Sequence, residues 1–253
     1  MKAWDARNMG MKGLCKVNSP QVDFKAEEVA ALRRAIQRKE HLREGLLCTT
    51  VWAACQGYND VHREVGKETL FISAYGMTDP LPSTGRQPEI FKGVMKDVLQ
   101  LCQRVAEGKL AAATVIMPIF AGHHYVASCL SLTKEVGVLR AVYRVADSFE
   151  EPWGPTQIKA EAAFAGFKDG LGTRVQWSTE GCMYSALGQQ KDAAADRSAS
   201  EWSCGLHMVA NCISWLREGR WAQSRAESGL SWRDLRKAHW DLTICAAAKV
   251  LAE

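Results

Sequence analysis

Three β-rich runs that follow one another closely constrain the fold of this chain more than any other feature. They are AATVIMPIF (112–120), HYVASCLSL (124–132) and GVLRAVYRVAD (137–147), and only short glycine-containing turns separate them. Branched and aromatic residues favour strands, and turns this short join neighbouring strands in antiparallel order. The sequence therefore predicts an antiparallel meander at the centre of the molecule.

Helical patterns stand on both sides of this meander. We predict helices over 25–45, 46–58 and 89–108 before it, and over 158–172, 204–219 and 231–253 after it. We predict further strands over 68–76 and 173–180, and loops over 79–88 and 188–203. Helices and strands that gather in separate stretches indicate an α+β fold. We expect one domain over 24–253, preceded by an N-terminal extension over 1–23.

The composition excludes several classes of protein. Hydrophobic residues make up 47% of the chain and charged residues 24%, which is typical of a globular domain. The net charge of +4 is small and the basic residues are scattered, so we expect no nucleic-acid partner. The longest apolar run (110–122) is too short to cross a bilayer, so we expect no membrane association. The first residues lack the apolar core of a secretory signal, which favours an intracellular protein of the cytoplasm or nucleus.

The nine cysteines do not show the spacing of a disulfide or zinc framework. Their number is odd, and no pair has the C-x-x-C spacing. Most of them stand among apolar residues and are expected to be small core residues. We expect neither a metal ion nor an organic cofactor, and any reactive cysteine has to be found by its context.

Three polar residues stand at positions that hydrophobic periodicity does not explain. His124 begins the second strand of the meander, Asp147 ends the third, and Cys204 begins a predicted helix. Antiparallel pairing places the start of one strand beside the end of the next, so Asp147 would lie beside His124 and orient its imidazole. The start of a helix and a neighbouring imidazolium both stabilise a thiolate. Each residue alone has an ordinary structural explanation, but together they indicate a Cys-His-Asp hydrolase triad.

These residues and the words around them resemble the ubiquitin-like-protein proteases (the SUMO protease family) and, more distantly, the adenovirus protease. The matching words are VIMPIFAGHHY, VADSF, GQQ and SCGLHMVAN, which occur in the family's order between about residues 40 and 217. The resemblance implies a papain-like or adenain-like cysteine peptidase fold, with a central mixed or antiparallel sheet flanked by helices.

The resemblance also implies a role for each matching residue. His124, followed by the aromatic Tyr125, would be the general base, and His123 would be a turn residue. Asp147 would orient His124, and Cys204 would be the nucleophile. Gln190, the second glutamine of GQQ, would donate its side-chain N–H to the oxyanion together with the backbone N–H of Cys204. Two other glutamines are left as alternatives for this position, Gln189 and Gln176.

Two departures from the family pattern concern the substrate. Tyr125 stands where the family prefers tryptophan, and LLCTTVW (46–52) lacks the tryptophan that opens the family's entry helix and the aspartate that follows it. That entry tryptophan helps to close a narrow tunnel over a diglycine tail in the family. The reaction class therefore follows from the resemblance more directly than the diglycine specificity does.

We predict a monomeric cysteine peptidase that cleaves the C-terminal peptide or isopeptide bond of a ubiquitin-like protein. A viral-type protease that processes a polyprotein is the second interpretation. An acetyltransferase of related fold, as found among bacterial effectors, and a catalytically inactive module that binds a ubiquitin-like protein are further alternatives. A viral protein or bacterial effector would act inside the host cell.

Overall fold

The computed structural model describes residues 34, 38, 44–72, 89–121, 123–190 and 202–252. The helices are α2 (Glu44–His62), α3 (Glu89–Ala106), α4 (Gly154–Leu171), α5 (Cys204–Glu218), α6 (Arg225–Ser228) and α7 (Trp232–Ala252). The strands are β1 (Lys67–Phe71), β2 (Ala112–Ile116), β3 (Ile119–Ala121), β4 (His124–Glu135), β5 (Val138–Asp147) and β6 (Gln176–Ala186). None of the described helices is both long and apolar enough to cross a membrane.

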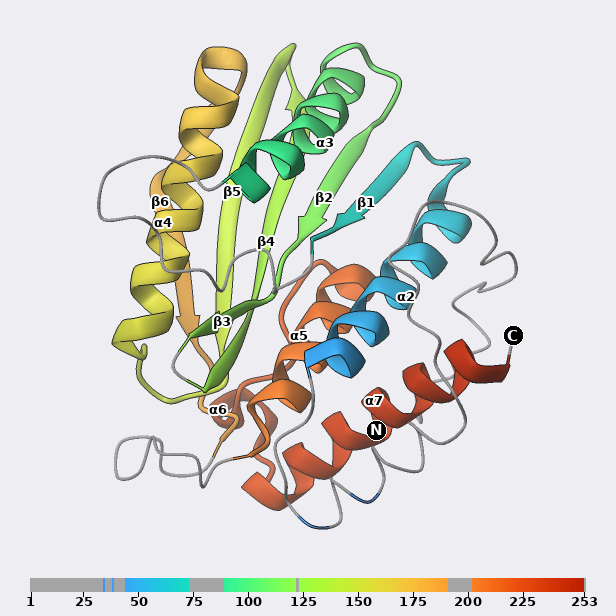
Figure 1. Cartoon of the computed structure of the whole chain (residues 1–253), viewed down its shortest axis with the longest axis vertical. Helices are drawn as coiled ribbons and strands as arrows, with labels where there is room; N and C mark the ends of the chain where they lie inside the picture. The colour runs from blue at the N-terminus through green and yellow to red at the C-terminus, as the bar shows by residue number, and fades with distance from the viewer. Residues whose placement is uncertain are drawn as a thin grey trace.

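The strands form one mixed sheet in the order β1-β2-β4-β5-β6, with β3 paired to the first residues of β4 (Figure 1). The central pairs, β2 with β4 and β4 with β5, are antiparallel, as the predicted meander requires. The outer pairs, β1 with β2 and β5 with β6, are parallel. The fold is therefore α+β with a mixed central sheet, which confirms the predicted class.

Two hydrophobic cores lie on the two faces of this sheet. Helices α3 and α4 cover one face, and α2 and α5 cover the other, with α7 packed outside α2 and α5 (Figure 1). Successive side chains of a strand point to opposite faces, so β4 serves both cores. Leu130 and Leu132 belong to the first core, whereas Ala127 and Cys129 belong to the second. Cysteines are part of both cores, as we expected from their apolar surroundings: Cys48, Cys55, Cys102, Cys129, Cys204 and Cys212 are all buried.

A buried pair of histidines joins α5 to α7. Nδ1 of His207 lies 2.6 Å from Nδ1 of His239, and both side chains are buried. Burial lowers the pKa of His239 to about 4 and the pKa of His207 well below its ordinary value. Both rings are therefore neutral at physiological pH, and one donates its N–H to the other.

Several predicted boundaries differ from the observed ones. Helix α4 begins at Gly154, four residues before the predicted start at 158, because Pro155 in the first turn is already compatible with a helix. The strand predicted over 173–180 begins only at Gln176, after a 3₁₀ turn over Gly172–Arg174, and continues to Ala186. Strand β1 ends at Phe71, and residues 73–76 of the strand predicted over 68–76 lie outside the described residues.

The loop predicted over 188–203 is not exposed at its ends. Gln189, Gln190, Trp202 and Ser203 are all buried, because polar partners and α5 enclose both ends. Some predictions lie outside the described residues: the extension over 1–23 and its boundary, the helix over 25–45 apart from residues 34, 38, 44 and 45, the loop over 79–88, and the interior of 188–203.

Gly205 lets α2 approach the start of α5 closely. A Cβ atom at this position would lie 2.5 Å from Cδ1 of Leu47, a residue of α2 with no exposed surface. Contacts of that length do not occur between carbon atoms in folded proteins, so the Leu47 side chain would have to move. The small residue after Cys204 is therefore required by packing.

We expect Gly205→Ala to lower the free energy of unfolding by about 1–3 kcal/mol, the usual cost of overpacking a core. In a Leu47→Ala background, Gly205→Ala should instead raise the free energy of unfolding by up to about 1 kcal/mol. The clash is then gone, and alanine has a higher helix propensity than glycine. Denaturant unfolding of the four proteins measures both effects. An equal cost of Gly205→Ala in the two backgrounds would contradict this account of the packing.

Candidate active site

His124 and Asp147 form a buried pair where β4 begins and β5 ends. Nε2 of His124 lies 2.7 Å from Oδ1 of Asp147, and both side chains are almost fully shielded from solvent. The antiparallel register of β4 and β5, which pairs Ala127 with Ala146, brings the two residues together. His123 is an exposed turn residue with φ of 69°, so its neighbour His124 is the histidine that meets the carboxylate.

The carboxylate of Asp147 accepts hydrogen bonds on both oxygens. Besides His124, the backbone N–H of Phe149 donates to Oδ1 over 3.0 Å, and the hydroxyl of Tyr184 donates to Oδ2 over 2.6 Å. Burial by itself raises the pKa of Asp147, but the hydrogen bonds and the charge of His124 outweigh it and lower this pKa below its ordinary value. Asp147 is therefore ionised, and three donors fix its orientation.

Tyr184 reaches this carboxylate from β6. Its register partner in the parallel β5–β6 pair is Val145, two residues before Asp147. Burial and the nearby carboxylate both raise the pKa of the Tyr184 hydroxyl, which keeps it protonated as a donor. The hydroxyl of Thr156, on α4, lies 2.9 Å from that of Tyr184 and 2.9 Å from the carbonyl oxygen of Trp153. The site is thus connected to both β6 and α4.

Two aromatic rings cover His124. The ring of Phe149 stacks on the imidazole with centroids 3.9 Å apart and planes 3° apart. Trp153 meets the same imidazole edge to face, with centroids 5.4 Å apart. These contacts exclude water from the His124–Asp147 pair and strengthen their electrostatic interaction.

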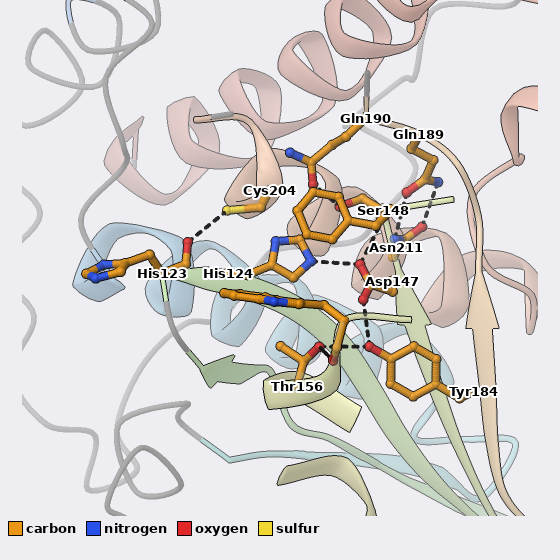
Figure 2. Close-up of polar contacts among 12 residues, drawn as sticks. His123, His124, Asp147, Ser148, Thr156, Tyr184, Gln189, Gln190, Cys204 and Asn211 are labelled. Carbon is orange, nitrogen blue, oxygen red and sulfur yellow. Dashed lines mark hydrogen bonds and ion pairs between the residues drawn. The ribbon is translucent and has the colours of Figure 1, made fainter. Parts of the chain in front are cut away.

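Cys204 is the first residue of α5 and lies on the other side of His124. Its Sγ lies 3.9 Å from the carbonyl oxygen of His123. Since Nε2 of His124 faces Asp147, Nδ1 is the nitrogen available to the thiol, and Figure 2 shows this nitrogen on the side of the ring toward Cys204. The start of a helix adds a favourable field for a thiolate.

The protonation of His124 reflects both partners. Burial lowers the pKa of the imidazole, but hydrogen bonds with Asp147 and Cys204, and the charges of both, outweigh burial and raise it to about 9. His124 is therefore an imidazolium at neutral pH. A positive charge beside Cys204 is the arrangement that stabilises a reactive thiolate.

Gln190 presents an unpaired donor to this site. Its side chain is completely buried; Oε1 accepts a hydrogen bond from the hydroxyl of Ser148, whereas Nε2 has no partner among the described residues. Figure 2 shows Gln190 on the same side of His124 as Cys204, with Nε2 pointing away from Ser148. A buried, unpaired N–H close to a nucleophile is the kind of group that binds a developing oxyanion.

The two alternative glutamines lie elsewhere. Gln189 exchanges two hydrogen bonds with Asn211, of 3.1 and 3.0 Å, and its Nε2 also lies 3.3 Å from the carbonyl oxygens of Ala222 and Gln223. Its amide is therefore occupied in joining this segment to α5. Gln176 is exposed at the first position of β6, whereas Asp147 pairs with Ala186 at the last. Neither glutamine offers a free donor beside Cys204.

Four residues that contact the triad or Gln190 were not among the predicted site residues: Ser148, Phe149, Trp153 and Tyr184. Ser148 and Phe149 directly follow Asp147, so their place in the matching word VADSF is a signal that points to them. Tyr184 carried no such signal, because it lies beyond the predicted end of its strand and reaches Asp147 only through the parallel pairing of β6.

The raised pKa of His124 makes the stability of the fold depend on pH. An unfolded histidine titrates near pH 6.5, and the folded one near 9. The stabilisation by charged His124 is therefore fully present below about pH 6.5 and is lost as the pH rises through about 9. We expect the difference in unfolding free energy between the wild type and His124→Gln to shrink over this window.

Denaturant titrations between pH 6 and pH 10 measure this difference. His123→Gln is the matched control, because its side chain is exposed and makes no contact with Asp147, and it should retain the wild-type pH dependence. A difference that stays constant or grows with pH would contradict the raised pKa.

No family model matches the chain, and no curated protein matches it in sequence. Solved structures do match. The C-terminal Ulp1 protease domain in complex with Smt3, the yeast ortholog of SUMO, superposes with a TM-score of 0.54 at 10% identity, covering 96% of this chain and 92% of that one. The SUMO protease Ulp1 with its catalytic cysteine oxidised to a sulfonic acid superposes with a TM-score of 0.51 at 10% identity, covering 90% and 97%. The resemblance drawn from the sequence is confirmed at the level of the fold: over most of its length, this chain has the fold of the Ulp1 protease domain.

Proposed function

We propose that this protein is a cysteine peptidase that cleaves the C-terminal peptide or isopeptide bond of a ubiquitin-like protein. The observation that carries the proposal is the arrangement of Cys204, His124 and Asp147, in which a buried ion pair lies beside a thiol at a helix start. The order of these three residues along the chain supports the same reaction.

In the first half of the reaction, the thiolate of Cys204 attacks the carbonyl carbon of the substrate's scissile bond. The carbonyl oxygen becomes an oxyanion, which Nε2 of Gln190 and the backbone N–H of Cys204 stabilise. The His124 imidazolium then donates its proton to the leaving amine as the C–N bond breaks, which leaves a thioester on Cys204 and a neutral imidazole.

In the second half, neutral His124 takes a proton from water while the water oxygen attacks the thioester carbon. The same two donors stabilise the second oxyanion. When the C–S bond breaks, the product leaves as a carboxylic acid that loses its remaining proton to the solvent, and the thiolate and imidazolium are restored. Asp147 stays ionised throughout and holds Nε2–H of His124, so that Nδ1 keeps facing the reacting atoms.

The substrate class rests on the fold. The Ulp1 domain that shares it was solved in complex with Smt3, the yeast ortholog of SUMO. Tyr125, where the family prefers tryptophan, is buried and packs on Phe120 with ring centroids 4.5 Å apart. We therefore propose a ubiquitin-like substrate without assigning which member of that group is cleaved.

Ubiquitin-like proteins that carry a C-terminal electrophile provide the test of this function. We expect one or more probes in a panel that includes ubiquitin and SUMO to form a covalent adduct with the wild type at Cys204. Cys204→Ala should abolish the adduct, measured by intact-protein and peptide mass spectrometry. Cys182→Ser is the matched control, because Cys182 is more exposed than Cys204 but burial and the charge of Glu161 raise the pKa of its thiol to about 11, and the change should leave labelling unchanged.

Two outcomes separate the chemistry from the substrate. Labelling of Cys204 by iodoacetamide, but by none of the ubiquitin-like probes, would overturn the substrate class and leave the reactive thiolate in place. Faster alkylation of Cys182 than of Cys204 by iodoacetamide would overturn the triad itself.

Gln190→Ala should lower kcat by roughly a hundred- to a thousandfold with little change in KM, since an oxyanion donor acts mainly in the transition state. Gln189→Ala is the neighbouring control. Under conditions in which the Gln189→Ala variant is folded, its kcat should equal that of the wild type. Its free energy of unfolding should fall by about 1–3 kcal/mol, because Asn211 loses its hydrogen-bond partner. Steady-state kinetics and denaturant unfolding of both variants distinguish the two roles. Wild-type kcat in Gln190→Ala would remove Gln190 from the oxyanion site.

A further inference from the structure

The residue after Asp147 holds Gln190 in two ways. Ser148 is almost completely buried, and its hydroxyl donates a hydrogen bond to Oε1 of Gln190 (Figure 2). Its backbone carbonyl oxygen accepts the N–H of Gln190 over 2.8 Å. Ser148 therefore fixes both the backbone and the side-chain amide of Gln190.

The side-chain contact decides which end of the amide reaches Cys204. A glutamine amide carries an acceptor and a donor on one carbon, and a half-turn of its last torsion exchanges them. A buried acceptor without a partner is unfavourable, because it has lost its hydrogen bond to water. The Ser148 hydroxyl donates to Oε1, which leaves Nε2 as the end of the amide without a partner among the described residues.

Without that hydroxyl, the orientation of the amide is no longer fixed by a local partner. Oε1 would be a buried acceptor with nothing on its own side, and the amide would rotate to find another donor. A rotated amide would present a carbonyl oxygen, with its partial negative charge, to the place where the oxyanion forms. Such an amide would destabilise the transition state instead of stabilising it.

We propose that Ser148 is a positioning residue for oxyanion stabilisation, acting through Gln190. The inference rests on the proposed oxyanion role of Gln190 and extends it. Two consecutive residues at the end of β5 then serve two separate parts of the site, because Asp147 orients the base and Ser148 orients the oxyanion donor. Asp147 is the last residue of β5, whereas Ser148 and Gln190 lie just beyond β5 and β6 and are joined to each other by these two hydrogen bonds.

The test is a double-mutant cycle with p-nitrophenyl acetate, which acylates a reactive thiol through a tetrahedral oxyanion without requiring the natural substrate. We expect Ser148→Ala to lower the acylation rate of Cys204 by roughly tenfold or more, up to the loss caused by Gln190→Ala. In a Gln190→Ala background, Ser148→Ala should cause no further loss, because there is no amide left to orient. Ser148→Thr keeps the hydroxyl and should retain most of the rate.

A second readout separates this role from a disturbance of Asp147 next to it. The pH dependence of the acylation rate reports the ionisation of the Cys204–His124 pair, and Ser148→Ala should leave it in place. An equal loss in the wild-type and Gln190→Ala backgrounds, or a displaced pH profile, would overturn the inference. A loss in Gln190→Ala with none in Ser148→Ala would overturn only the positioning role, whereas no loss in Gln190→Ala would overturn the oxyanion role on which it rests.

Discussion

The buried ion pair between His124 and Asp147 is the interaction around which the rest of the site is arranged. Removing two charges from water is costly, and a buried pair contributes little net stability unless further groups satisfy it. Here the backbone N–H of Phe149 and the hydroxyl of Tyr184 donate further hydrogen bonds to the Asp147 carboxylate. The rings of Phe149 and Trp153 keep water away from the His124 imidazole. So much structure around one charged pair is typical of a functional site.

This pair also explains why the site lies at the end of the sheet. The antiparallel pairing of β4 and β5 places His124 beside Asp147, and the parallel addition of β6 brings Tyr184 to the free carboxylate oxygen. Helix α5 supplies Cys204 from the opposite side, and its closeness to α2 depends on Gly205 and Leu47. Groups held by strands and helices can keep the short distances that the chemistry requires.

Much of this arrangement could be predicted from local sequence. The three β-rich runs implied an antiparallel meander, and the meander alone implied that His124 and Asp147 are neighbours. The order of His124, Asp147 and Cys204, with GQQ between the last two, was enough to suggest the reaction class. The predicted ends of helices and strands were less accurate. Helix α4, for example, begins four residues before its predicted start, because Pro155 is compatible with the first turn of a helix.

What the sequence by itself determined is which residues form the proposed triad and which strands and helix carry them, because strand alternation and helix-start signals act over a few residues. Only the tertiary structure decided which glutamine keeps an unpaired donor, since Gln189 and Gln190 are adjacent and chemically identical. Asn211 engages the first and Ser148 orients the second, and both are more than twenty positions away along the chain. The hydrogen bond of Tyr184 with Asp147 could not be predicted from the sequence either. It depends on the parallel register of β5 and β6, which the residue pattern within either strand does not specify.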